Sequence, residues 1–578
     1  MNPVLLVIDD DPSDLAACER LLRIRYGADY RVLGERSPEA AIELLARLAH
    51  EGADVALVAA ALHMAGMEGV EILARARALH PRAMRALLVG LDNRWTRIPF
   101  SALGALQRAT ALGRIDLWIV KGWVSPEDLV YPYVQEALSV WTRANWPRHE
   151  VLRVVGKRWT PASHALHDVL ARNTVPFGFY DADSDQGRRL LTEFTVDTTR
   201  LPAVILHDRS VLHDPSLVDV AGALGVPTQP TAEVYDLAII GAGPAGLAAA
   251  VFGASEGLRT VVVEPRAIGG QAGTSSMIRN YLGFPRGVSG SDLTFRAWEQ
   301  TLLFGAQFVF TQRAVGVTAH GDERVIALSD GSAVCARAVL IAAGVEYRRL
   351  GIPALERLVG VGVFYGAASV EAPALAGEQV YIVGGANSAG QAALQLARFA
   401  ARVTLLIRGG SLEAGMSDYL VKQIRATPNV TLRLGTQVVD GRGEDRLEHL
   451  TLEEVGTGRR AEVAAAAVYV MIGAEPHTEW LHDAVARDER GYLLTGRDVP
   501  AAAWPLQRPP LPFETSMPGV FAAGDARHGS VKRVAGAVGE GSVTIGSVHQ
   551  YLAERARADT VVGETDEAAA AAPAQNRL

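Results

Sequence analysis

Cysteine is almost absent from this 578-residue chain, which holds only Cys18 and Cys335 and no CxxC motif. Cys18 falls in a helical pattern and Cys335 in a strand pattern, so we expect small buried side chains rather than reactive thiols. A disulfide reductase that used these two thiols would have to bring together positions 18 and 335 from different predicted domains. Redox chemistry through a CxxC pair is excluded.

The chain also lacks long apolar segments and an excess of basic residues. The run VAAAAVYVMIGA (463–474) stops at Glu475, short of the roughly 18 residues that a membrane helix needs. A net charge of −8 provides no basic surface for nucleic acid. The N-terminus MNPVLLVIDDD lacks the basic segment of a signal peptide. We therefore expect a cytoplasmic protein with no membrane or nucleic-acid partner.

What is present is a dinucleotide-binding pattern at 235–246, YDLAIIGAGPAG. A strand runs into the glycine turn, a helix follows, and the next strand ends in Glu264. Gly241 permits the tight turn, Gly243 lets the backbone approach a pyrophosphate, and Gly246 allows helix and strand to pack closely. Glu264 can accept hydrogen bonds from ribose hydroxyls. The pattern predicts a bound dinucleotide, the alternative being a glycine turn that serves packing alone.

A second turn of this kind lies in the segment 378–410, with Gly384, Ala386 and Ala389 at the pattern positions. Ala386 adds a methyl group where a pyrophosphate would approach, so this turn departs from the ideal. The following strand ends in Arg408, and a cation there suits a 2′-phosphate, which favours NADPH over NADH. Two dinucleotide folds in one chain indicate one flavin and one nicotinamide.

The segment 519–545 fits the flavin, because it reads as a strand, then Gly524-Asp525, then a helix. An acid beside a helix N-terminus can hydrogen-bond a ribityl hydroxyl, and the helix dipole stabilises negative charge on a reduced ring. The alternative is that Asp525 is a plain turn acid.

Residues 1–145 alternate five strands with helices, which predicts a doubly wound parallel sheet. This block resembles the receiver domain of bacterial response regulators through Asp9-Asp10-Asp11, HMAGMEG (63–69) and Lys121. The resemblance implies Mg²⁺ on the acids and an aspartate that takes a phosphoryl group, but that position is Ala61 and the hydroxyl position is Val89. Alanine has no nucleophilic oxygen, so phosphorylation there is excluded. Asp9 and Asp10 are at most a vestigial metal site, or only a solvated loop, and no other metal site is expected.

Residues 148–227 read as β-α-β-α-β-α and resemble a thioredoxin or glutaredoxin-like module, with Leu201-Pro202 opening the third strand. The resemblance implies a cis proline and a redox CxxC around positions 159–164, where no sulfur is present. Such a module cannot exchange thiols, and we expect it to bind a partner or to act as a spacer between domains. Alternatively, Pro202 simply begins a strand.

From about 233 onward the chain resembles low-molecular-weight thioredoxin reductase. The motifs are GAGPAG (241–246), GGQAG (269–273), IRNYLGFP (278–285), IAAGVEYRRLGIP (341–353), GGANSA (384–389), FAAGD (521–525) and KRVAGAVGEGS (532–542). The resemblance implies a homodimer and a split FAD domain, 233–350 plus 476–555, around a nicotinamide domain at 351–475.

The implied FAD-binding residues are Gly241, Gly243, Pro244, Ala245, Gly246, Glu264, Gly270, Gln271, Asn280, Gly344, Gly524, Asp525, Val534 and Ala535. The implied nicotinamide-cofactor residues are Gly384, Ala386, Asn387, Ser388, Ala389 and Arg408.

The sequence departs from this family at the redox cysteines and at the residues that bind the 2′-phosphate. Its redox cysteines fall on Gly366 and Ser369, and a hydroxyl cannot form a disulfide or a flavin–thiol adduct. A second arginine expected for the 2′-phosphate is Glu413, so NADH remains possible. The sequence predicts an FAD-dependent NAD(P)H oxidoreductase that passes electrons to an unidentified acceptor or partner redox protein, with Ser369 and Tyr365 lining the flavin face. The alternative is a flavin-based redox sensor or scaffold whose first two blocks bind partners.

The predicted fold class is therefore multidomain α/β: a flavodoxin-like receiver, a thioredoxin-like module, and two Rossmann-like domains for FAD and NAD(P)H. The tail, 556–578, is Ala-rich and polar and is expected to be disordered.

Overall fold

The computed structural model describes residues 2–90, 102–111, 113–123, 125–145, 150–275, 277–285, 287–366 and 372–570. The chain divides into two compact units. One combines Met1–Glu150 with Glu371–Val439 and His449–Val468, and the other combines Val151–Val370 with Asp440–Glu448 and Tyr469–Leu578. Among the described helices, none has both the length and the apolar content that a membrane crossing requires.

The first unit begins with a five-stranded parallel sheet in the order β2-β1-β3-β4-β5, the flavodoxin-like doubly wound order. Its strands are β1 (Val4–Ile8), β2 (Arg31–Glu35), β3 (Val55–Ala61), β4 (Met84–Val89) and β5 (Leu117–Val120). The helices are α1 (Pro12–Tyr26), α2 (Pro38–His50), α3 (Gly69–Leu79), α4 (Leu103–Ala111), α5 (Pro126–Leu129) and α6 (Tyr131–Asn145). All five expected strands are present.

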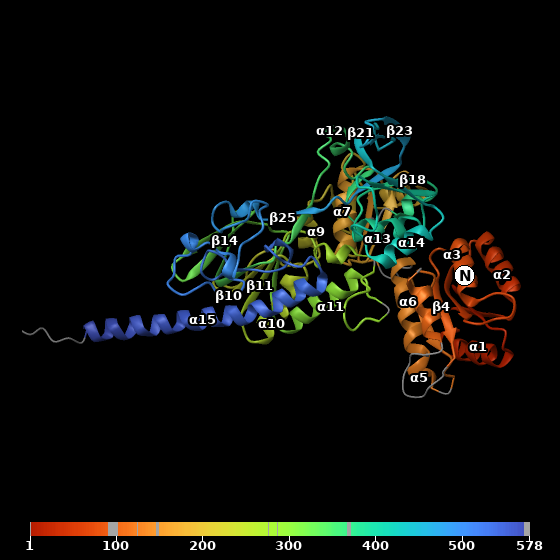
Figure 1. The fold of residues 1–578 in the computed structure, drawn as a ribbon, viewed down its shortest axis with the longest axis horizontal. Helices are drawn as coiled ribbons and strands as arrows, with labels where there is room; N and C mark the ends of the chain where they lie inside the picture. Colours follow the sequence, from red (N-terminus) through yellow and green to blue (C-terminus); the bar gives the residue numbers. More distant parts are fainter. Residues whose placement is uncertain are drawn as a thin grey trace, which may run out of the picture. The chain divides into compact units, whose positions relative to one another are not determined.

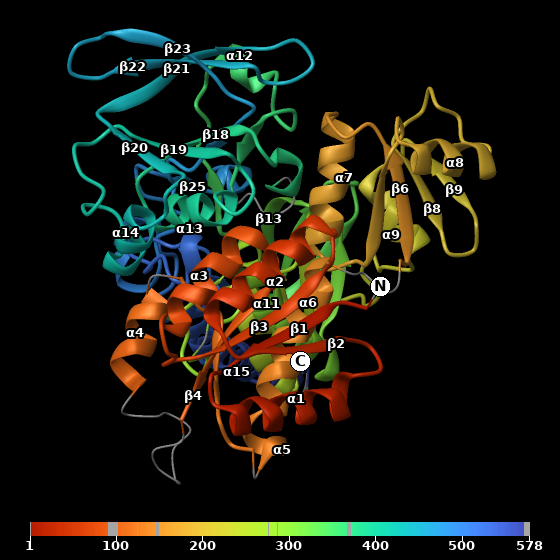
Figure 2. The same ribbon diagram turned by 90° about the vertical axis from the view of Figure 1, so that its right-hand side faces the viewer.

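Helices cover both faces of this sheet (Figure 2). Apolar residues of α2 and α3 pack on one face and those of α1 and α6 on the other. Local sequence explains the helix starts, because the side chain of Asp11 caps α1 and that of Ser37 caps α2, with proline in the first turn of each. Ala61 and Val89 end β3 and β4 and are fully buried.

A second set of strands in the first unit follows residue 378. Here β18 (Gln379–Val383), β19 (Arg402–Ile407) and β20 (Val430–Leu434) are parallel and in register, and β22 (His449–Glu454) pairs with β23 (Arg460–Ala464). The other elements of this region are α13 (Asn387–Leu396), α14 (Asp418–Arg425), β21 (Thr436–Arg442), β24 (Ala467–Val470) and the short helix Ala372–Leu375.

These two parts of the first unit are in contact through hydrogen bonds to carbonyl groups. Arg398 Nη2 donates to the Pro81 oxygen at 2.7 Å, and Gln423 Nε2 donates to the Thr110 oxygen at 3.3 Å. Burial lowers the pKa of Arg398, which Asp116 partly offsets. The α4 end of the N-terminal sheet is thus joined to α14.

The second unit begins with a four-stranded sheet in the order β7-β6-β8-β9. Its elements are β6 (Leu152–Gly156), α7 (Pro161–Arg172), β7 (Phe177–Asp181), α8 (Asp185–Glu193), β8 (Ala203–Leu206), β9 (Val211–His213) and α9 (Leu217–Ala223). The strand β9 was not foreseen, because its three residues are too few to show a pattern. The Leu201–Pro202 peptide is cis, as the resemblance implied.

A seven-stranded sheet forms the larger part of the second unit. Parallel strands β12-β11-β10-β15 are followed by antiparallel β14 and β13, and β26 pairs with the end of β15. The strands are β10 (Tyr235–Ile240), β11 (Thr260–Glu264), β12 (Gln307–Phe310), β13 (Ala314–His320), β14 (Glu323–Leu328), β15 (Ala333–Ile341) and β26 (Val520–Ala522). The helices are α10 (Pro244–Ser255), α11 (Gly290–Leu303) and α15 (Val534–Ala570), and α15 runs alongside α10 (Figure 1).

The tail departs from expectation, because α15 continues to Ala570 through sequence that we expected to be disordered from residue 556. Alanine has the highest helix propensity, and the Ala-rich sequence extends a helix that has already formed. The last eight residues lie outside the described part.

A two-stranded ribbon joins two distant segments of the second unit. In it β16 (Val345–Tyr347) pairs antiparallel with β25 (Ala474–Pro476). These segments lie next to positions 350 and 476, where the chain is expected to enter and leave its nicotinamide domain. The short elements α12 (Pro353–Glu356) and β17 (Val363–Tyr365) follow β16.

Candidate functional site

The glycine turn after β10 has the geometry that a bound pyrophosphate requires. Gly241 has φ of +102°, which disfavours any other residue. A Cβ atom on Gly246 would lie 1.9 Å from the Gly241 oxygen, whereas one on Gly243 would meet nothing within 4 Å. Helix α10 begins at Pro244, and Ala245 is buried beneath its first turn. The turn is closed on its packing side and open on the side where a phosphate would approach.

Glu264, at the end of β11, is buried against this turn. Its Oε2 accepts from the Ala242 amide at 2.8 Å, and its Oε1 accepts from the Arg266 and Ala267 amides at 2.9 and 3.0 Å. Three amide donors fix the carboxylate, and a carboxylate oxygen can accept a further hydrogen bond. Glu264 is therefore held at the place where a ribose hydroxyl could donate to it.

The FAAGD turn meets the first turn of α10 at the same edge of the sheet. A Cβ atom on Gly524 would lie 2.9 Å from the Ala245 Cβ, and one on Gly541 would lie 2.1 Å from the Ala245 oxygen. The Gly524 position also approaches Ala537 of α15 at 3.9 Å. The predicted residues Val534 and Ala535 belong to the same first turn of α15. The structure thus brings together segments that are far apart in the sequence.

Two residues that sequence reasoning missed hold this second turn. Glu540 Oε2 accepts from the Gly524 amide at 2.8 Å, and Arg527 donates to both oxygens of Glu540 at 3.1 and 2.8 Å. Burial raises the pKa of Asp525, an effect that Lys532 opposes and Glu540 strengthens. Lys532 therefore compensates only part of the cost of burying the Asp525 carboxylate, and the carboxyl group can accept a further hydrogen bond.

The GGQAG segment lies against the first turn. A Cβ atom on Gly270 would be 3.3 Å from the Gly243 Cα, and the side chain of Gln271 donates to the Val345 oxygen, one residue beyond Gly344. Asn280 is different, because it lies in a separate loop that the Ile278–Val288 bridge closes. The structure gathers the other predicted flavin residues around the two glycine turns.

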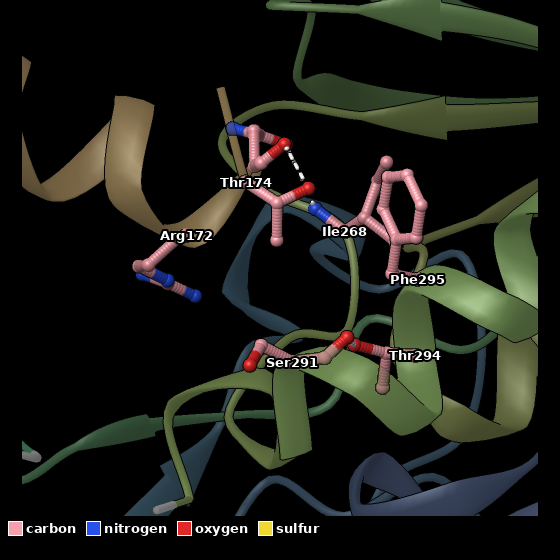
Figure 3. A pocket seen from close by; sticks show the side chains of 7 residues that line it. Arg172, Thr174, Ile268, Ser291, Thr294 and Phe295 are labelled. Atoms are coloured by element: carbon pink, nitrogen blue, oxygen red, sulfur yellow. Dashed lines mark hydrogen bonds between the residues drawn. The ribbon is translucent and has the colours of Figure 1, made fainter. Parts of the chain in front are cut away.

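Helix α7 of the four-stranded domain ends on this same segment (Figure 3). Arg172 Nη2 donates to the Gly270 oxygen at 3.1 Å, while Asn173 donates to the Arg266 oxygen and accepts from the Ile268 amide. A shallow depression, too small to hold a water molecule, lies beside these contacts and is lined by Arg172, Asn173, Thr174, Ile268, Ser291, Thr294 and Phe295. The domain at 151–227 therefore braces the loop that approaches Gly243.

The other end of α7 carries two hydroxyls where a dithiol was expected in the related fold. Thr160 Oγ1 donates to Ser163 Oγ at 3.0 Å, and a Cβ atom on Gly156 would lie 2.7 Å from that Ser163 oxygen and 3.0 Å from Pro202 Cβ. The ring of His164 lies 5.2 Å from that of Phe364. The hydroxyl pair thus adjoins the cis proline, and α7 contacts the segment that leads to position 366.

Position 366 is shaped for glycine. Its φ is +103°, and a Cβ atom would lie 2.6 Å from Cε2 of Tyr347. The neighbouring Tyr365 donates to Glu356 and accepts from the Leu350 amide, and burial, with the Glu356 hydrogen bond, raises the pKa of Tyr365 to about 12. The Tyr365 hydroxyl is therefore hydrogen-bonded to α12 through Glu356. Ser369 lies outside the described residues.

The second glycine turn lies at the end of β18 in the first unit and begins with Gly384. Ala386 is the residue before α13, Asn387 begins the helix, and Ala389 is buried, while Ser388 is exposed. Asn387 Oδ1 accepts from the Ser417 amide at 2.8 Å. This bond ties the segment before α14 to the turn, a feature that the sequence did not indicate.

Arg408, the cationic residue predicted at the end of β19, is free to bind an anionic group. Arg408 is exposed, and in the part of the chain that the structure describes it has no hydrogen bond or ion pair. Glu413 instead pairs with Arg425. Arg408 is therefore the candidate for a 2′-phosphate, as the sequence indicated.

The acidic cluster of the N-terminal sheet is held by a lysine. Lys121 Nζ lies 2.7 Å from Asp9 Oδ2 and 2.8 Å from Asp14 Oδ2, while Asp10 accepts from the Ala65 amide. Burial works against the charge of Lys121, but its hydrogen bonds to Asp14 and Asp9 outweigh it and raise its pKa. Within the described residues no group of three or more His, Cys, Asp or Glu could hold a metal.

Both cysteines are unpaired. Cys18 is buried, as expected, and burial raises the pKa of its thiol to about 12. Cys335 is only partly buried, contrary to expectation, because it lies in the part of β15 where every second residue reaches the surface.

Comparison with known proteins covers the region from β10 to α15. Residues 235–541 match the family model described as pyridine nucleotide-disulphide oxidoreductase. A thioredoxin reductase from Treponema pallidum is 32% identical over 320 residues, which are 55% of this chain and 97% of that relative. A component of alkyl hydroperoxide reductase from Staphylococcus epidermidis is 29% identical over 318 residues, 55% of this chain and 59% of that relative. The crystal structure of Lactococcus lactis thioredoxin reductase superposes with a TM-score of 0.50 at 26% identity, covering 55% of this chain and 99% of that one.

Proposed function

The chain belongs to the pyridine nucleotide-disulphide oxidoreductase family, and we propose that it is an FAD-dependent oxidoreductase that uses NADPH or NADH and passes electrons to an acceptor without an internal disulfide. The main support is the glycine turn before α10, with the FAAGD turn beside it. At Gly246 an added Cβ atom would clash with the backbone, whereas at Gly243 there is free space for a phosphate. A bound flavin supplies the electron-carrying chemistry in such a protein.

The residues around this turn fit the flavin cofactor. The amides at the start of α10 would hold the pyrophosphate, Glu264 the ribose, and Asp525 a ribityl hydroxyl. Gly270 and Gln271 would border the isoalloxazine side. The partly desolvated charge of Asp525 supports a ligand that donates a hydrogen bond to it.

The nicotinamide cofactor would occupy the turn before α13. Exposed Arg408 supports recognition of a 2′-phosphate. Because the second arginine position is Glu413, we expect only a moderate preference for NADPH. Ala386, in place of glycine, is compatible with a looser fit.

Electrons would leave by a route other than a protein disulfide. Positions 366 and 369 carry no sulfur, and the phenol and hydroxyl of Tyr365 and Ser369 cannot replace a dithiol. Relatives are named for thioredoxin and for alkyl hydroperoxide, so the acceptors to test are an external disulfide, a peroxide, a quinone, oxygen and a partner redox protein.

Anaerobic reduction tests this proposal. The full chain loaded with FAD is mixed separately with NADPH and with NADH, and the flavin absorbance is followed. We expect bleaching with NADPH at the lower concentration, and then reoxidation when the correct acceptor is added. Protein that binds no FAD, or FAD that neither nucleotide reduces, contradicts the proposal.

A redox sensor or scaffold is the second candidate. Its support is the contact of Arg398 and Gln423 with the Pro81 and Thr110 carbonyls, because it joins the N-terminal sheet to the part that would bind nicotinamide. We propose that residues 1–145 are a receiver-like domain and 148–227 a thioredoxin-like module, supported by the strand orders and the cis Leu201–Pro202 peptide. Slow reoxidation by every acceptor, together with a scattering profile that changes on reduction, would favour this role.

The assembly and setting of the protein follow from the same family. We propose a homodimer in the cytoplasm, which sedimentation and fractionation would test.

A further inference from the structure

Tyr347 is a residue that the sequence analysis did not single out. It ends β16, in the ribbon with β25, three residues after Gly344. Gly344 follows β15, whose carboxyl end adjoins the glycine turn: a Cβ atom on Gly241 would lie 2.5 Å from the Ala342 oxygen. Tyr347 therefore lies close along the chain to the edge at which the predicted flavin residues gather.

Contacts on two sides fix the Tyr347 side chain. On one side, a Cβ atom at position 366 would lie 2.6 Å from Tyr347 Cε2, so the ring fills the space that a side chain there would occupy. On the other side, Thr274 opposes the rise in the Tyr347 pKa that burial causes, and the Thr274 hydroxyl donates to the Gln271 oxygen at 2.8 Å. The ring thus bridges position 366 and the 270–274 segment.

Helix α7 also reaches this segment. Arg172 Nη2 donates to the Gly270 oxygen at 3.1 Å. Gln271, whose side chain donates to the Val345 oxygen, ties the same segment to β16. The Tyr347 side chain is therefore held by its neighbours while it remains partly exposed.

We propose that the Tyr347 ring contacts the flavin and occupies the place that the first cysteine of the redox pair takes in thiol-carrying members of the family. This inference rests on the proposed function, because it requires bound FAD. It follows from geometry: position 366 is the first cysteine position in the resemblance, a side chain there would meet the Tyr347 ring, and Gln271, which is predicted to border the flavin, is hydrogen-bonded to β16. The phenol covers the flavin face and transfers no electrons in turnover, so a flavin–sulfur adduct has no room there.

Flavin fluorescence tests the contact without any substrate. A tyrosine in van der Waals contact with an excited flavin quenches it by rapid electron transfer, whereas phenylalanine does not. The FAD-loaded full chain carrying Tyr347→Phe keeps the ring and loses the quencher. We expect its fluorescence yield to rise several-fold and its fastest decay component to disappear.

Tyr235→Phe is the matched control. Tyr235 begins β10, at the end of the strand opposite the glycine turn, and its hydroxyl donates to Gln307 Oε1 at 2.8 Å. We expect unchanged fluorescence in this variant. An unchanged yield in Tyr347→Phe, or an equal rise in both variants, would overturn the contact while leaving flavin binding intact. A wild-type chain that takes up no FAD would overturn the proposed function as well.

Discussion

Replacing Gly366 with alanine tests whether the backbone and its surroundings at this position exclude any side chain, including that of cysteine. Gly366 combines a φ of +103° with a neighbour, Tyr347 Cε2, only 2.6 Å from an added Cβ atom. Gly366→Ala introduces that atom and nothing else. Both the backbone conformation and the packing then become unfavourable.

The two costs can be estimated separately. A residue other than glycine in such a backbone conformation costs about 1–3 kcal/mol. Forcing an extra carbon into a filled space costs about 1–3 kcal/mol more. Gly473 separates these effects, because its φ is +99° and a Cβ atom there would meet nothing within 4 Å. Gly473→Ala should therefore carry the backbone cost alone.

Urea denaturation followed by circular dichroism measures both variants against the wild type. We expect Gly366→Ala to lower the unfolding free energy by about 1–3 kcal/mol more than Gly473→Ala does. Adding Tyr347→Leu to Gly366→Ala should remove most of this difference, as a double-mutant cycle would show. Equal destabilisation by the two alanines would refute the packing argument and the claim that the Tyr347 ring fills the cysteine position.

Three further outcomes follow from the site geometry. Gly246→Ala should lower the unfolding free energy of the FAD-free chain, since its Cβ atom would lie 1.9 Å from a carbonyl oxygen. Gly243→Ala should change that free energy by no more than about 0.5 kcal/mol and reduce only FAD retention, measured by the flavin-to-protein absorbance ratio. Arg408→Ala should raise the KM for NADPH about tenfold, the effect of one charge-assisted hydrogen bond, and that for NADH far less; equal changes in steady-state assays would remove its role. Burial raises the pKa of Asp525 above its value in the unfolded chain, so its contribution to stability is present below the usual carboxyl pKa and is lost as pH rises through the folded value. In thermal melts Asp525→Asn should therefore stabilise the FAD-free chain at pH 7 but not in acid below the usual carboxyl pKa, while weakening FAD binding. Stabilisation independent of pH would contradict this.

The glycine turn and the strand order were predictable because short-range rules govern them. Gly241, Gly243 and Gly246 must stand at fixed spacing between a strand and a helix, and the structure places them as expected. The approach of Gly524 to Ala245 was inferable only through the family resemblance, since the contact depends on how β26 joins β15.

Contacts set by tertiary packing were missed. Tyr347 meets position 366 because a ribbon folds back on the sheet, and no periodicity relates positions 347 and 366. Glu540 holds the Gly524 amide from within a helix whose sequence shows only ordinary surface character. Asn280 lies in the loop that the Ile278–Val288 bridge closes, and its role at the flavin stays a prediction from the family motif.

The ammonium group of Lys121 lies between Asp9 and Asp14, 2.7 and 2.8 Å from their oxygens. A diffusible divalent ion can be removed by a chelator or diluted below its dissociation constant, but a charge attached through the chain has a local concentration set by bond lengths. The single charge of Lys121 therefore offsets one of these two carboxylate charges at any concentration of free ions. The pair of carboxylates keeps a tethered counter-charge that a chelator cannot remove.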